Sequence, residues 1–118
     1  MFSCLFTLVS LSLTSLVAAQ IVKTGTLTSY GPQLTSITCG TTCVNNYGWI
    51  AVSQANIDDY PCGTIVRVWD PANTVSVVVP ICDTCTTCAN DDFEANPDVV
   101  ARIGYVGASS VPGAHWDI

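Results

Sequence analysis

Basic side chains are scarce in this sequence. Of its 118 residues only three are lysine or arginine, against nine aspartates and glutamates, and the formal net charge is −6. Nucleic-acid binding depends on cations that neutralise phosphates, and an anionic membrane surface attracts the same cations. With only Lys23, Arg67 and Arg102 available, we expect neither nucleic acid nor an anionic membrane as a partner.

The sequence contains only one histidine, His115. One histidine leaves little room for a Ser-His-Asp triad, and the sequence has no glycine-rich phosphate loop. A zinc site needs four ligands, usually cysteine or histidine. We therefore expect no metal and no cofactor, and we interpret His115 as a strand-surface residue.

The first nineteen residues carry no charge and are almost wholly apolar or small. They end in the small-residue sequence Val17-Ala18-Ala19, which is typical of a signal-peptide cleavage site. A membrane anchor is the alternative, but it needs about 20 apolar residues, and serines interrupt this run. We predict a signal peptide at 1–19 and one secreted, extracellular, monomeric domain at 20–118, because no repeat or linker divides the rest.

Cysteine is the residue type that the chain has in excess. Cys4 lies in the predicted signal peptide, and six others remain. An even number in a small exported domain predicts a disulfide framework, and six cysteines allow 15 pairings between which the sequence does not choose. The predicted disulfide cysteines are Cys39, Cys43, Cys62, Cys82, Cys85 and Cys88.

Three of these cysteines form a C-x2-C-x2-C run in the stretch ICDTCTTCANDD. An iron–sulfur site with this spacing continues with x3-C-P, but here Asp92-Phe93 follows. A redox dithiol is a further alternative, although no basic residue lies beside the run to lower a thiol pKa. We interpret these cysteines as disulfide partners.

Short alternating segments rich in Val, Ile and Thr predict strands, and turn signals separate them. One helix is expected from Pro97 to Ile103, with Asn96 as its cap and Gly104 after its end. Loop or turn structure is expected over 31–46 and 56–63. The predicted strands are Thr24–Tyr30, Trp49–Ser53, Thr64–Trp69, Thr74–Val79 and Ala114–Ile118.

The order of several short motifs resembles the rare-lipoprotein-A-like, expansin-like and barwin-like group, in its short fungal form. The matching pieces are GTLTSY, Cys39-Gly40, Ala51-Val52-Ser53, Cys62-Gly63 with two valines after it, and Asp83-Thr84-Cys85. The resemblance covers about 25–118. It implies an all-β fold, a six-stranded double-psi β-barrel with one short helix and disulfide staples.

The resemblance also implies a polysaccharide site. Asp83 takes the position of a strand-end aspartate, and Asp92, or less securely Asp91, that of a second acidic residue, although the D-L-S motif is broken here. These would be the catalytic or loosening carboxylates, with Asp83 at the mouth of a groove and replaceable by Asn without loss of stability. The predicted substrate-binding residues are Thr28, Tyr30, Trp49 and Trp116.

Three functions follow as hypotheses. The first is a secreted expansin-like module that binds or loosens cell-wall polysaccharide without hydrolysis. The second is a glycoside hydrolase or lytic transglycosylase, which needs two suitably spaced carboxyl groups. The third is a module that binds a secreted or host protein, such as a protease inhibitor, defence protein or effector. The altered Asp91-Asp92-Phe93 segment counts against an enzyme.

Overall fold

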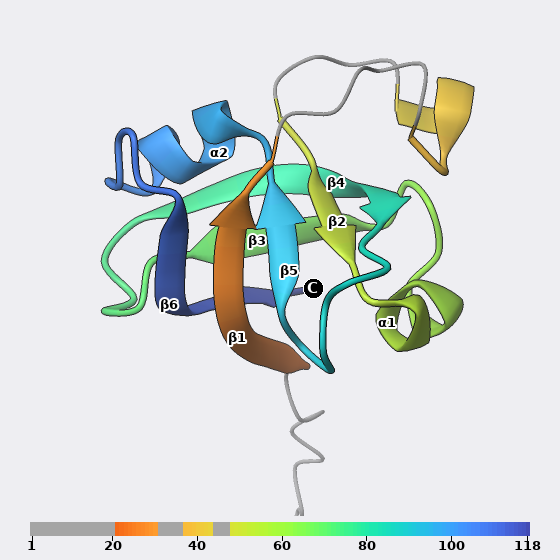
Figure 1. Cartoon of the computed structure of the whole chain (residues 1–118), viewed down its shortest axis with the longest axis horizontal. Coiled ribbons are helices and arrows are strands. Elements are labelled where there is room, and N and C mark those ends of the chain that lie inside the picture. Colours follow the sequence, from red (N-terminus) through yellow and green to blue (C-terminus); the bar gives the residue numbers. More distant parts are fainter. Residues whose placement is uncertain (1–20, 31–36, 44–47) are drawn as a thin grey trace, which may run out of the picture.

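The structure is a computed structural model that describes residues 21–30, 37–43 and 48–118. The predicted signal peptide and much of the predicted 31–46 loop lie outside these residues. Six strands close into a barrel in the order β1-β5-β2-β4-β3-β6 (Figure 1). The elements are β1 (Val22–Ser29), η2 (Gly40–Cys43, a 3-10 helix), β2 (Ile50–Val52), α1 (Gln54–Asp59), β3 (Ile65–Trp69), β4 (Ser76–Thr84), β5 (Phe93–Ala95), α2 (Pro97–Arg102) and β6 (Ser110–Asp117).

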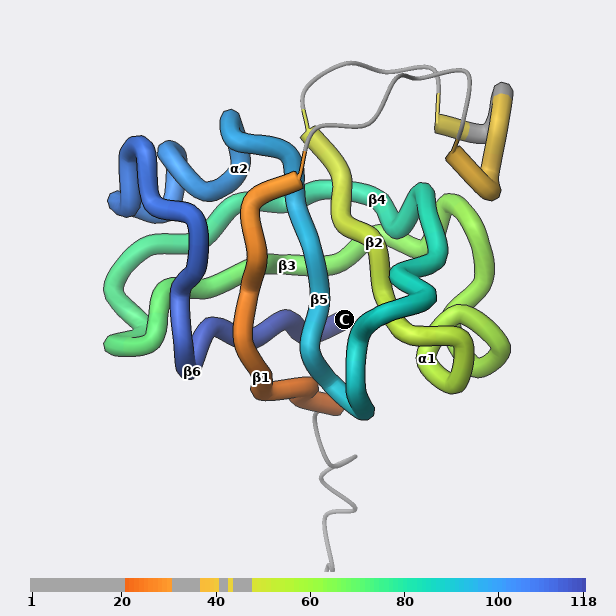
Figure 2. The backbone as a smooth tube through the Cα atoms, in the orientation of Figure 1, coloured from red at the N-terminus to blue at the C-terminus, as the bar shows by residue number. Residues whose placement is uncertain are grey.

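Strand pairing mixes parallel and antiparallel neighbours. β1 pairs in parallel with β5, and β2 in parallel with β4, whereas the other pairs are antiparallel. β3 and β4 form the predicted hairpin, and β4 continues to Thr84, beyond its predicted end. The path of the chain in Figure 2 shows β5 between β1 and β2. Pairing of this kind brings together residues that are far apart in the sequence.

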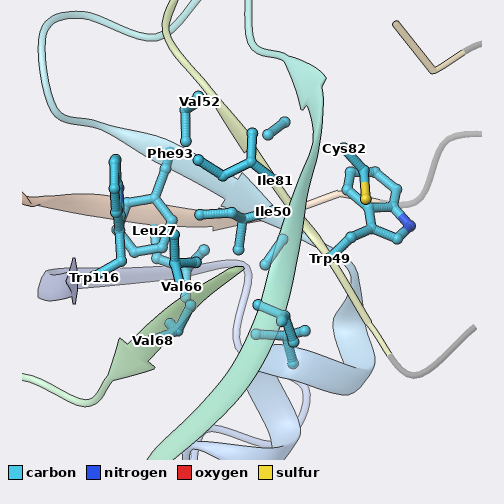
Figure 3. Close-up of a cluster of buried hydrophobic side chains, with 14 of the residues drawn as sticks. Leu27, Trp49, Ile50, Val52, Val66, Val68, Ile81, Cys82, Phe93 and Trp116 are labelled. Carbon is cyan, nitrogen blue, oxygen red and sulfur yellow. The ribbon is translucent and has the colours of Figure 1, made fainter. Parts of the chain in front are cut away.

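Alternating side chains from the strands fill the barrel. Leu27, Phe93 and Trp116 have no exposed surface, and they lie together on one side of the close-up in Figure 3. Val66 and Val68 of β3 point into the same core, and Arg67 between them is exposed. Burial of these side chains is the main favourable contribution to folding, about 1.5–3 kcal/mol for each large apolar side chain.

Three elements were not predicted from the sequence: α1, β5 and the 3-10 helix η2, which lies in the predicted 31–46 loop. A turn was predicted over 56–63 and a single helix in the whole domain, but α1 occupies Gln54–Asp59. Its six residues are too few for an apolar repeat to show. Ser53 caps it by accepting a hydrogen bond from the Asn56 backbone N–H (3.3 Å), and Ile57 is buried. The three-residue strand β5 was missed for the same reason of length.

Replacing Ser53 with alanine tests this cap. We expect the free energy of unfolding to fall by about 1 kcal/mol, because the Asn56 N–H loses its acceptor at a buried site. Equilibrium urea unfolding measures the change. Ser53→Asp is the matched control, since it keeps an acceptor at the cap. Equal stability of the Ala and Asp variants would show that the cap contributes nothing.

Three disulfides join all six cysteines of the predicted mature chain, which confirms the predicted framework. Cys39 bonds Cys62 and Cys43 bonds Cys82, so two bridges tie the segment around η2 to the barrel. The third joins Cys85 to Cys88 across a sequence separation of 3. Within the described ranges, no helix has the length and apolar character needed to cross a membrane.

Candidate functional site

Strand register places four residues in one row across neighbouring strands. Asp83 of β4 pairs with Ala51 of β2, Ala51 pairs with Glu94 of β5, and Glu94 pairs with Thr28 of β1. Neighbouring strands lie about 4.8 Å apart, so the Asp83 and Glu94 backbones are about 10 Å apart. Glu94 is half-buried and Thr28 is exposed, so this row opens to solvent at its β1 end. We name these four residues the outer-face row.

A β-bulge brings Asp83 into that row. Val77, Val79 and Ile81 are buried at alternate positions of β4, and strict alternation would direct Asp83 into the same core. The register instead shifts, because Ile50 pairs with Ile81 whereas Ala51 pairs with Asp83. The extra residue, Cys82, changes the phase of the strand. Bulges commonly re-aim side chains next to functional sites.

Asp83 is held by four hydrogen-bond donors. Its Oδ1 accepts from the Thr38 N–H (2.8 Å), the Thr38 hydroxyl (2.8 Å) and the Thr84 N–H (2.9 Å). Its Oδ2 accepts from the Tyr30 hydroxyl at 3.4 Å. The residue is only 4% exposed. Asp83 is therefore buried and does not lie at an exposed groove mouth as expected, and its donors indicate that it anchors the Thr38 segment to the barrel.

Burial, and after it the charge of Asp83, raises the pKa of two neighbouring groups. Burial raises the pKa of Glu94, and the negative charge of Asp83 raises it further. The pKa of the Tyr30 hydroxyl is raised by burial first and then by the charges of Asp83 and Glu94. This site therefore favours protons on both groups. A protonated Glu94 can donate a hydrogen bond, whereas Asp83 can only accept while it is ionised.

Replacing Asp83 with asparagine should lower the Glu94 pKa towards its ordinary value, because the like charge disappears while the side chain keeps its size. Carbon-detected NMR titration of the Glu94 carboxyl measures this pKa in both proteins. Asp59→Asn, on the exposed side of α1, is the control and should leave it unchanged. An unchanged Glu94 pKa in Asp83→Asn would mean that the two carboxylates do not interact.

Asp91 and Asp92 make structural contacts outside the outer-face row. Asp92 accepts a hydrogen bond from the Thr26 N–H (2.9 Å) beside the bulge in β1. Asp91 accepts from the Asn56 side-chain amide (3.1 Å) and lies 3.9 Å from the Lys23 ammonium. The structure thus gives both carboxylates partners that hold the turn before β5. The acidic residue that the register brings into line with Asp83 is Glu94.

The predicted aromatic residues differ in exposure. Trp116 has no exposed surface and Trp49 is 4% exposed, so neither ring offers a face to a ligand, and both belong to the core. Tyr30 is half-buried and packs edge-on against Trp49, with ring centroids 5.9 Å apart. Of the predicted substrate-binding set, Thr28 and Tyr30 reach the surface near the two acidic residues.

Glu94 was missed by sequence reasoning, which assigned the second acidic position to Asp92. The signal was present in the spacing, because about two more residues separate Asp92 from the helix than separate the D-L-S aspartate from it in the group that the sequence resembles. Counting backwards from the Asn96-Pro97 cap, instead of forwards from the cysteines, moves that position two residues, onto Glu94. The alternation Phe93 buried, Glu94 half-buried, Ala95 buried is that of a short strand.

One further group lies beside the row. The sulfurs of Cys85 and Cys88 and a carboxylate oxygen of Glu94 lie within 4.8 Å of one another. In the oxidised protein the two sulfurs are bonded to each other at 2.04 Å. A disulfide is not a thiolate ligand, so this group binds no metal in the oxidised state.

No protein-family model and no curated protein matches the sequence. Solved structures match its fold, and with the topology above they define the chain as a double-psi β-barrel, as predicted. One is a papain inhibitor from Streptomyces, with a TM-score of 0.65 and 22% identity over 82% of this chain and 93% of the inhibitor. At such identity the likeness establishes the fold alone.

Expansin from Clavibacter michiganensis is a second similar protein. Its apo structure has a TM-score of 0.66 and 20% identity, covering 83% of this chain and 50% of the expansin. A point mutant of that expansin in complex with cellohexaose has a TM-score of 0.60 and 21% identity, with the same coverage. The chain therefore spans about half the length of this expansin.

Proposed function

We propose that this chain is a secreted, expansin-like double-psi barrel that binds cell-wall polysaccharide along the outer-face row without hydrolysing it. The observation that carries the proposal is the register that aligns Glu94 with Thr28 on β1 and, across Ala51 of β2, with Asp83, whose carboxylate accepts from the Tyr30 hydroxyl. Glu94, Thr28 and Tyr30 reach the surface and can exchange hydrogen bonds with sugar hydroxyls, whereas the buried Asp83 holds the Tyr30 hydroxyl in place. Three disulfides support export, because such bridges persist in oxidising compartments.

The absence of hydrolysis follows from the environment of Asp83. An inverting glycosidase needs one carboxylic acid and one carboxylate that activates water. Glu94, with its raised pKa, suits the acid. Asp83 does not suit the base, because it is 4% exposed and its Oδ1 already accepts three hydrogen bonds. The site then has a carboxylic acid, Glu94, but among the described residues no accessible carboxylate to act as the base. Such a site can bind a glycan but cannot activate a water molecule to attack it.

A sedimentation assay tests both parts of this proposal. The purified protein is incubated with insoluble cellulose, chitin or peptidoglycan, and the bound fraction and the soluble products are measured. We expect binding to at least one glycan and no products above a heat-denatured control. Reducing sugars or soluble peptidoglycan fragments that increase with protein concentration would identify an enzyme. No binding to any of the three would reject the polysaccharide site.

A second candidate function is protein binding, and a different wall of the barrel favours it. Ile65, Val78 and Ile118 are more than half exposed beside Arg67 and Trp69, around a hollow of about 280 Å³. Aromatic residues and arginine are enriched in protein interfaces. This surface lies on β3, which is opposite β5 in the strand order. Inhibition of a papain-like protease that is lost in Val78→Glu, but kept in Glu94→Gln, would favour this second function.

A further inference from the structure

The Cys85–Cys88 turn keeps its shape through backbone hydrogen bonds as well as through its disulfide. The Cys85 N–H donates to the Val52 carbonyl of β2 (2.7 Å), and the Cys88 N–H donates to the Cys85 carbonyl (3.3 Å). The end of the turn is fixed by the Asp92 N–H, which donates to the Ala89 carbonyl (2.9 Å). The two cysteines would therefore stay close to each other if their bridge were opened.

Of the three disulfides, Cys85–Cys88 is also expected to contribute least to the stability of the fold. It spans a sequence separation of 3, whereas the bridges of Cys39–Cys62 and Cys43–Cys82 span 23 and 39. Loop-closure entropy makes the stabilisation by a disulfide grow with the length of the loop that it closes. Cys88 is half-buried, as is Cys62 of the Cys39–Cys62 bridge, whereas Cys43 and Cys82 are 4% and 0% exposed, so loop length is what distinguishes the short bridge from both others. Mild reduction should open the short bridge first and leave the barrel folded.

Glu94 completes a set of three potential ligands at this turn. One of its carboxylate oxygens lies within 4.8 Å of both sulfurs, and no hydrogen bond or ion pair joins the Glu94 side chain to another of the described residues. Two cysteines separated by two residues have the spacing that structural zinc sites use. Thiolate ligands favour soft or borderline ions such as Zn²⁺ over Mg²⁺ or Ca²⁺.

We propose that Cys85, Cys88 and Glu94 form a redox-gated binding site for one borderline divalent cation such as Zn²⁺. A dithiol supplies two electrons and two protons to the bridge, which becomes two thiols, while the dithiol becomes a disulfide. The cation then binds the two sulfurs and the Glu94 carboxylate, and both thiol protons pass to solvent. Water supplies the fourth ligand, as in zinc sites with three protein ligands.

The first test follows the order of reduction. The protein is treated with increasing dithiothreitol, its free thiols are alkylated under native conditions, and peptide mass mapping locates them. We expect Cys85 and Cys88 to be alkylated at the lowest dithiothreitol concentrations, with an unchanged circular dichroism spectrum. Prior opening of either longer bridge, or unfolding when the short one opens, would contradict the proposal.

The second test measures metal binding after that selective reduction. The reductant is removed without oxygen and Co²⁺ is added, because its thiolate charge-transfer and tetrahedral d–d absorption bands report the ligands directly; Zn²⁺ then displaces it. We expect one ion per chain, no binding by the oxidised protein or by Cys85→Ser/Cys88→Ser, and affinity at least tenfold weaker in Glu94→Gln. Asp98→Asn, which removes an equal charge from exposed α2, should bind normally. No thiolate band, or equal affinity in Glu94→Gln, would overturn the assignment.

Discussion

Replacing Cys43 and Cys82 together by alanine is expected to lower the free energy of unfolding by about 4 kcal/mol. The bridge closes a loop with a sequence separation of 39, and opening it gives the unfolded chain many more conformations. It also ties η2 to the bulged end of β4, where Asp83 lies. Alanine is chosen because both positions are almost fully buried, where a serine hydroxyl would need a new partner.

Cys85→Ala/Cys88→Ala is the matched control for this measurement. Its loop has a separation of 3, and the same entropy relation gives a loss of about 2 kcal/mol. Equilibrium unfolding in urea, followed by tryptophan fluorescence, compares the two double variants with the parent protein. Equal losses, or a larger loss for the short bridge, would show that strain or denatured-state structure dominates over loop length.

Replacing Asp83 with alanine is expected to cost about 3 kcal/mol of stability, because two backbone N–H groups and the Thr38 hydroxyl lose their shared acceptor. The loss should be local at first, since these bonds attach the Thr38 segment to β4. Hydrogen exchange of the Thr38 and Thr84 amides should therefore quicken more than that of core amides. Urea unfolding gives the total change.

An Asp83→Asn variant separates the effect of the carboxylate charge from that of the hydrogen-bond geometry. Asp83→Asn keeps an oxygen acceptor for the three donors, so we expect a smaller loss of about 1 kcal/mol, the part due to the charge of the acceptor. An alanine variant within about 0.5 kcal/mol of the parent, as for an ordinary surface substitution, would contradict the anchoring role of Asp83.

Local sequence patterns were sufficient for the long strands. β3 and β4 bury valines at alternating positions and are separated by turn residues, and β1 is rich in threonine, whereas β6 begins at Ser110, before its predicted start at Ala114. Asn96 and the first-turn Pro97 likewise located α2, although the Asn96 side chain makes no capping bond and accepts from the Trp49 N–H (3.1 Å) instead. The short elements α1 and β5 were not predicted, because they contain too few residues for a periodic pattern. The disulfide pairing was also undetermined, since it depends on the three-dimensional positions of the cysteines.

The candidate site was predicted only in part, for a physical reason. Asp83 was found because it follows an apolar strand, but its burial depends on Thr38, which lies 45 residues away in sequence. Its place in the outer-face row depends on the bulge at Cys82, and no local sequence pattern predicts this bulge. Spacing back from Asn96-Pro97 could have pointed to Glu94, but the register of β5 with β1 and β2 that aligns Glu94 with Asp83 was not readable from composition or spacing.

Binding by Glu94→Gln, compared with Asp59→Asn, tests the central claim most directly. Both substitutions remove one negative charge, but only Glu94 lies in the outer-face row, whereas Asp59 is exposed on α1. Binding isotherms are measured on whichever insoluble glycan retains the parent protein. We predict that Glu94→Gln weakens binding about tenfold, equivalent to about 1.4 kcal/mol, and that Asp59→Asn binds like the parent. Equal binding by the two variants would contradict a polysaccharide site on this face.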